Sequence, residues 1–168
     1  MRGLVFFSLF FSVHAFASGP HGGHGAAADG LIPEATAAQV AEPPKGARVF
    51  FANIKDGQTV PAKVKIKFGL EGMGLRPALQ DVHDTKTGHH HLIINGQPVT
   101  RGGLVPTDER HLHFGQGQSE AEVTLPPGTH TLTLQFADGA HHSYGESMSA
   151  TVKVKMERAR GGTRGQSN

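Results

Sequence analysis

The 168-residue sequence contains no cysteine and no tryptophan, and it has a single tyrosine. Without cysteine, the protein has no disulfides, no thiolate metal ligands and no cysteine nucleophile. A strong charge imbalance is also missing, because 16 Lys and Arg residues stand against 14 Asp and Glu residues, a formal net charge of +2. The basic residues are spread along the chain apart from three arginines near its end. A nucleic-acid-binding groove is therefore not indicated.

Long hydrophobic runs are missing as well, and the longest apolar stretch lies at the start of the chain. Met1 and Arg2 precede an apolar run over residues 3–13, and Ala15-Phe16-Ala17 follows it. This order is typical of a secretory signal peptide. The alternative is a membrane anchor, but the run is shorter than the roughly 20 residues that span a bilayer. We expect a signal peptide over 1–17, export from the cytoplasm, and no integral membrane span after its removal.

Residues 18–47 are rich in Gly, Ala and Pro, and such a composition buries too little apolar surface to offset its ordering entropy. We expect a flexible arm there and a disordered tail over 157–168. The arm carries His21 and His24. An amino-terminal copper clip would need a backbone amide at the second position, which Pro20 cannot supply.

The region between the arm and the tail contains short segments that alternate between polar and apolar residues, which is typical of half-buried strands. The 23 glycines and 10 prolines also favour short strands and turns. A short helical stretch around residues 78–82 fits the connection at 71–88. We expect one domain over 48–156, an all-β, immunoglobulin-like antiparallel β-sandwich of about seven strands, with a small barrel as the alternative. The expected strands cover residues 49–54, 63–70, 89–95, 110–115, 120–125, 129–136 and 148–156.

Histidine is unusually frequent, with 12 copies, and nine of them lie in the expected domain. Residues two apart on a strand share a face, so His89 and His91 point one way, and His111 and His113 share a face of their strand. Imidazoles on adjacent strands can converge on Cu(II), Zn(II) or Ni(II). Asp108, Glu109, Glu120 or the loop residue His141 is expected to complete the ligand shell or orient it.

A metal-free interpretation stands beside this one. Histidines near strand ends can form a hydrogen-bonded polar network that ties loops to the backbone. His90 points away from its two neighbours, towards the side that carries Leu92 and Ile94. His130 lies on the inward face of its strand and is expected to be a hydrogen-bonded core or rim residue.

Catalytic arrangements are weak in this sequence, and we do not expect an enzyme. Asp138, His141 and Ser143 are close in sequence, but no strand-nucleophile-helix elbow is present. Glu120 and Glu122 share a strand face, which a solubility role at a sheet edge explains. A calcium loop of the DxDxDG kind is also missing.

Several blocks of the chain together resemble a known family. These are His89 to Asn95, Asp108 to Glu120, Leu125 to Leu132 and His141 to Gly145. In this order they resemble the bacterial exported domain-of-unknown-function family DUF4399 over residues 48–156. The resemblance implies a small exported module without an established activity. It matches the histidine-rich blocks of the family at His89, His90, His91, His111, His113, His130 and His141, whereas Asn95 stands where members often have Asp.

The end of the chain has a second resemblance. Leu125 to Leu132, followed by Asp138 to His141 and a last strand, is similar to the closing hairpin of periplasmic copper carriers of the copper-resistance type. There a loop histidine before the last strand binds Cu(II), and His141 or His142 would take its place. We therefore predict a copper or zinc protein for metal carriage or buffering, with an envelope protein as a partner. The predicted ligands are His89, His91, His111, His113 and His141.

Overall fold

The computed structural model describes residues 39–157. The expected signal peptide, the part of the arm before residue 39 and the tail from residue 158 lie outside the described residues. In the described part the strands begin at Arg48 and end at Met156, and no helix there is long and apolar enough to cross a membrane. The elements are β1 (Arg48–Phe51), β2 (Gln58–Val60), β3 (Lys63–Glu71), β4 (Gly74–Leu75), β5 (Thr87–Ile94), β6 (His111–Phe114), β7 (Glu120–Thr124), β8 (Gly128–Ala137), the 3-10 turn η1 (Glu146–Met148) and β9 (Ser149–Met156).

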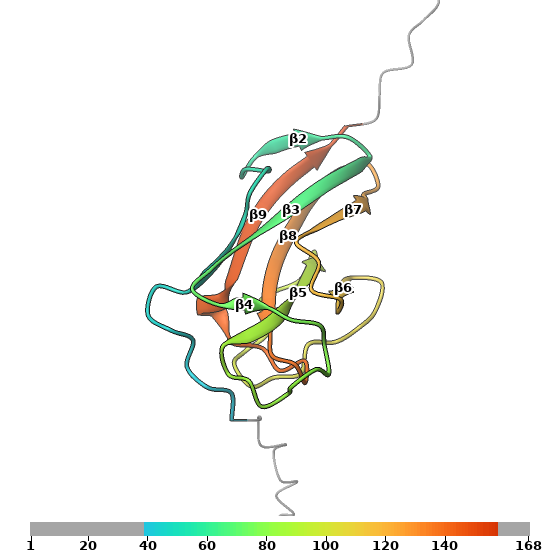
Figure 1. The fold of residues 1–168 in the computed structure, drawn as a ribbon. Coiled ribbons are helices and arrows are strands. Elements are labelled where there is room, and N and C mark those ends of the chain that lie inside the picture. The colour runs from blue at the N-terminus through green and yellow to red at the C-terminus, as the bar shows by residue number, and fades with distance from the viewer. Residues whose placement is uncertain (1–38, 158–168) are drawn as a thin grey trace, which may run out of the picture. The chain divides into compact units, whose positions relative to one another are not determined.

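The strands form two sheets (Figure 1). One sheet has the order β1-β3-β7, and the other has the order β2-β9-β8-β5-β4 with β6 paired to β5. In Figure 1, β3 passes in front of β9 and β8, so the two sheets lie face to face. The predicted immunoglobulin-like sandwich is confirmed.

Alternation along the strands explains which side chains fill the space between the sheets. Val64, Ile66 and Phe68 of β3 are buried, while the lysines between them are exposed. On the facing sheet, the buried inward positions of β8 are those that the sequence predicts. They are His130, Leu132, Leu134 and Phe136.

Seven strands coincide with the predicted ones, and two more were not predicted. β2 and β4 are only three and two residues long, and they pair in parallel with β9 and β5. Elements this short carry no periodicity, so only long-range pairing defines them. The expected helical stretch at 78–82 does not form. Leu79 and Asp81 have φ angles of 63° and 48°, which a right-handed helix does not allow.

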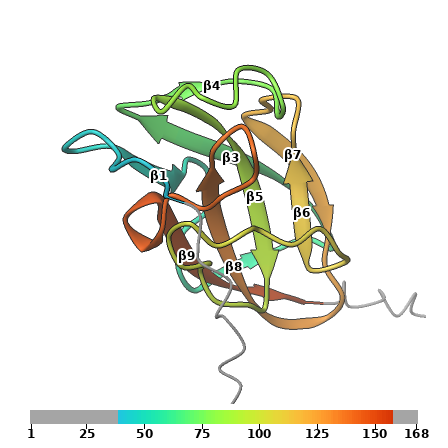
Figure 2. The ribbon, with the colours of Figure 1, turned by 90° about the horizontal axis from the view of Figure 1, so that it is seen from below.

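Two loops cover the outer face of the larger sheet, residues 95–110 after β5 and residues 138–145 after β8; both run across this sheet in Figure 2. Gln135 joins them, because its Oε1 accepts a hydrogen bond from Val99 N (3.1 Å) and its Nε2 donates one to Gly145 O (3.1 Å). Ser143 Oγ donates to Val99 O at 2.8 Å. Thr133 and Gln135 alternate with the inward residues of β8 and so face outward, but these loops bury both of them completely.

Candidate metal centre

Four histidines from three segments gather under the covering loops. His89 and His91 lie on β5, His113 on β6 and His141 in the loop after β8. The antiparallel register of β5 and β6 places His91 directly opposite His113. His141 then closes the group from the loop side, with its ring centroid 4.8 Å from that of His113 and 4.9 Å from that of His89. We call these four residues the histidine cluster.

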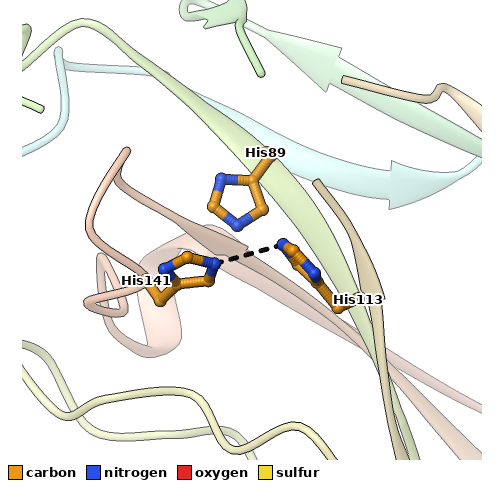
Figure 3. A group of neighbouring side chains, drawn as sticks. All are labelled: His89, His113 and His141. Carbon is orange, nitrogen blue, oxygen red and sulfur yellow. Dashed lines mark hydrogen bonds between the residues drawn. The ribbon is translucent and has the colours of Figure 1, made fainter. Parts of the chain in front are cut away.

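Ring nitrogens of three cluster residues, His89, His113 and His141, point toward one another (Figure 3). His91 Nε2 lies 3.0 Å from His89 Nε2, and His141 Nε2 lies 3.2 Å from His113 Nε2. One ring nitrogen from each of His89, His113 and His141 lies within 4.8 Å of the others. In a tetrahedral zinc site with Zn–N bonds of about 2.05 Å, neighbouring nitrogens are about 3.3 Å apart. The two short contacts are close to this edge length.

The cluster has a buried side and an open side. His89 and His91 are fully buried, whereas His141 is half-buried and His113 is exposed. Burial, with smaller contributions from the charges of neighbouring rings, lowers the pKa of His89 to about 3 and the pKa of His91 to about 2. Burial also lowers the pKa of His113. The rings of His89 and His91 are therefore neutral at neutral pH and offer nitrogen lone pairs.

The N–H groups of His89 and His91 do not all find hydrogen-bond acceptors within this pair of rings. In the contact between His89 and His91, one Nε2 donates and the other accepts. The accepting ring must carry its hydrogen on Nδ1, yet the Nδ1 atoms of both rings are buried without a hydrogen-bond partner among the described residues. At least one buried N–H group is thus unpaired, at a cost of about 1–3 kcal/mol.

Comparison with known proteins identifies the family. A family described as "Domain of unknown function (DUF4399)" matches residues 66–157. This chain belongs to the DUF4399 family. No curated protein matches the chain.

Two solved structures are similar at low scores. The fibronectin(III)-like modules of CbhA from Clostridium thermocellum share 16% identity and a TM-score of 0.38, covering 67% of this chain and 99% of that one. The endo-beta-1,4-mannanase from Thermotoga petrophila shares 16% identity and a TM-score of 0.39, covering 67% of this chain. The similar region spans only 20% of the mannanase.

The family match includes every member of the histidine cluster, because residues 66–157 run from β3 to the end of β9. β1 and β2 precede the matched residues. The cluster thus lies within the region of this protein that matches the DUF4399 family.

His111 is the one predicted ligand that the structure does not bring into the cluster of this DUF4399 domain. The register places it opposite Ile93, two residues along the strand and therefore about 7 Å from the position of His113. Its Nδ1 is bonded to Asp108 Oδ1 at 2.9 Å, and that hydrogen bond lowers the pKa of the Asp108 carboxyl. Glu120, a predicted accessory ligand, lies on β7 of the smaller sheet and instead pairs with Lys65 of the neighbouring strand β3.

His130 is the hydrogen-bonded inward residue that the sequence predicts. Its Nε2 donates to Pro126 O at 2.8 Å, and its Nδ1 accepts from Asn95 Nδ2 at 3.2 Å. Both ring nitrogens have partners, and the contact with Asn95 ties β8 to the turn that ends β5.

His90 lies on the core side of β5, between Phe68 and Phe136, with ring centroids 5.3 and 5.2 Å away. It is completely buried, and neither ring nitrogen has a hydrogen-bond partner among the described residues. Burial lowers its pKa to about 4. The core thus holds a neutral imidazole whose polar atoms are unpaired.

We expect His90→Leu to stabilise the protein by about 1–3 kcal/mol, because leucine has a similar volume and no polar atoms to leave unpaired. Urea unfolding at neutral pH measures this change. His90→Ala is the matched control and should destabilise the protein by about 2 kcal/mol or more, since it leaves a cavity. A destabilising His90→Leu would mean that the imidazole is satisfied in solution.

Proposed function

We propose that this DUF4399 protein binds one divalent transition metal ion, copper or zinc, through the imidazoles of His89, His91, His113 and His141. The observation that carries the proposal is the convergence of ring nitrogens of His89, His113 and His141 within 4.8 Å of one another, with His91 Nε2 joining through its 3.0 Å contact with His89 Nε2.

The donor set favours copper or zinc over hard cations. Neutral imidazole nitrogens suit these metals, while calcium and magnesium prefer oxygen. Two acidic residues are close in sequence to cluster members, and both are engaged elsewhere. Asp108 is hydrogen-bonded to His111, and Asp138 accepts hydrogen bonds from backbone N–H groups. Binding with a Kd of about 1 µM corresponds to about 8 kcal/mol, more than the cost of about 1–3 kcal/mol for each unpaired Nδ1–H group on His89 and His91.

The open side of the cluster supports carriage or buffering rather than a closed structural site. His113 is exposed and His141 is half-buried, so an ion can enter and leave there while His89 and His91 stay in the interior. The expected signal peptide would place this exchange in the periplasm or the medium, where an envelope protein would give or receive the ion.

The rival function is a metal-free structural or interaction domain of the cell envelope. The ring contacts at 3.0 and 3.2 Å favour it, because they are also hydrogen-bond distances. Metal titration separates the two functions.

We expect the metal-free protein, starting at residue 18 and without a tag, to bind one equivalent of Cu(II) or Zn(II) with a Kd below about 1 µM. Calorimetry and competition with a chromophoric chelator measure it. A variant with His21→Ala and His24→Ala removes the arm histidines and should bind equally well. His111→Ala should also bind equally well, since its ring is held by Asp108. Binding weaker than about 1 µM, or binding lost with the arm histidines, would favour the metal-free domain.

A further inference from the structure

His141 is the only cluster residue that is not on a strand, and its backbone is unusual. Its φ angle is 69°, in the left-handed region that few non-glycine residues adopt. Such a conformation costs on the order of 1 kcal/mol and persists only where the surroundings enforce it. Some part of the loop must therefore hold residue 141 in place.

The Asp138 side chain supplies that restraint. Its Oδ1 accepts hydrogen bonds from Ala140 N (2.9 Å) and His142 N (2.8 Å), one residue on each side of His141. The backbone adds bonds from His141 N to Asp138 O (3.1 Å) and from Asp138 N to His142 O (2.9 Å). The side chain of Asp138 is only 16% exposed. These bonds close the turn around His141.

We propose that Asp138 is a positioning residue, which holds His141 in the left-handed conformation and so keeps its ring against His113 and His89. Asp138 does not act as a ligand in this arrangement, because its Oδ1 is occupied by backbone N–H groups and its Oδ2 faces His142 Nδ1 at 3.5 Å. Without the acceptor, residue 141 relaxes toward a common backbone conformation and its ring leaves the cluster. Val105 N still donates to His141 O at 2.9 Å, which keeps the loop attached to the domain.

The first test needs no metal. Asp138→Ala removes the acceptor, while Asp138→Asn keeps a carbonyl oxygen of the same shape and is the matched control. We expect nuclear Overhauser contacts between the ring protons of His141 and His113 in the metal-free wild type and in Asp138→Asn, and their loss in Asp138→Ala. Persistence of the contacts in Asp138→Ala, or their loss in both variants, would overturn the proposal.

The second test rests on the proposed metal binding. Residues that orient metal ligands contribute about 10- to 100-fold to affinity, so we expect Asp138→Ala to weaken Zn(II) binding by about this factor and to speed release. In a His141→Ala background, Asp138→Ala should leave the remaining Zn(II) affinity unchanged, because the residue that Asp138 positions is gone. An equal loss in both backgrounds would overturn the positioning role. If Asp138→Ala loses the ring contacts while the wild type binds neither Zn(II) nor Cu(II), the proposed function is refuted and the role of Asp138 is supported.

Discussion

Replacement of His91 and His113 together by alanine is expected to reduce the affinity for Cu(II) or Zn(II) by at least about 1,000-fold. The two residues face each other across β5 and β6, and their ring centroids are 5.0 Å apart. The double variant therefore removes half of the ligand set, one nitrogen from the buried side and one from the open side. Loss of each ligand should lower the metal affinity by more than the roughly 10- to 100-fold that is lost when a residue orienting a ligand is removed.

A double variant with His83→Ala and His111→Ala is the matched control. It removes the same number of imidazoles, and both lie outside the histidine cluster. Competition titration with a chelator at neutral pH measures both variants, and circular dichroism shows that they are folded. Unchanged affinity in the His91 and His113 variant, or an equal loss in the control, would show that the metal binds elsewhere.

The metal-free protein is expected to lose most of its stability between about pH 6.5 and pH 4. In the folded state the pKa values of His89, His90 and His91 are lowered from 6.5 to about 3, 4 and 2, and burial is the largest cause in each case. The unfolded chain takes up protons near pH 6.5 and the folded chain does not. The stability from these rings is complete above pH 6.5 and falls as the pH drops toward the folded pKa values.

The size of this effect follows from the pKa difference. At about pH 5, His90 alone accounts for a loss of about 2 kcal/mol, since one pKa unit corresponds to about 1.36 kcal/mol. His91 accounts for a similar loss, and small domains have only about 5–15 kcal/mol in total. Some carboxyl groups also have lowered pKa values, such as those of Glu71 and Asp84. They add to the loss of stability only when the pH falls below the ordinary carboxyl pKa values near 4.

Urea unfolding at several pH values between 8 and about 4.5 tests this prediction. His90→Leu is the control, because it removes one titrating ring and should give a shallower dependence on pH. A free energy of unfolding that stays constant from pH 7 to about 5 would show that the rings take up protons equally in both states.

Periodicity predicted much of the fold because alternation is a local property of the chain. The lysine-rich face of β3 and the inward row of β8 could be read directly, since each strand has one face on the core. The same rule separated His90 from His89 and His91. It did not show that the outward face of β5 and β8 is also buried, because alternation along a strand does not tell whether the loop that follows folds back over the sheet.

By itself, then, the sequence determined the strand segments, the side of β5 on which each histidine points, and a set of five candidate ligands that contains the four residues of the cluster. The tertiary structure decided the rest. The register of β5 and β6 includes His113 and leaves His111 with Asp108, and the turn held by Asp138 brings His141 to the open side. The physical reason is that register and loop closure depend on contacts between residues distant in the chain, whereas alternation depends only on neighbours.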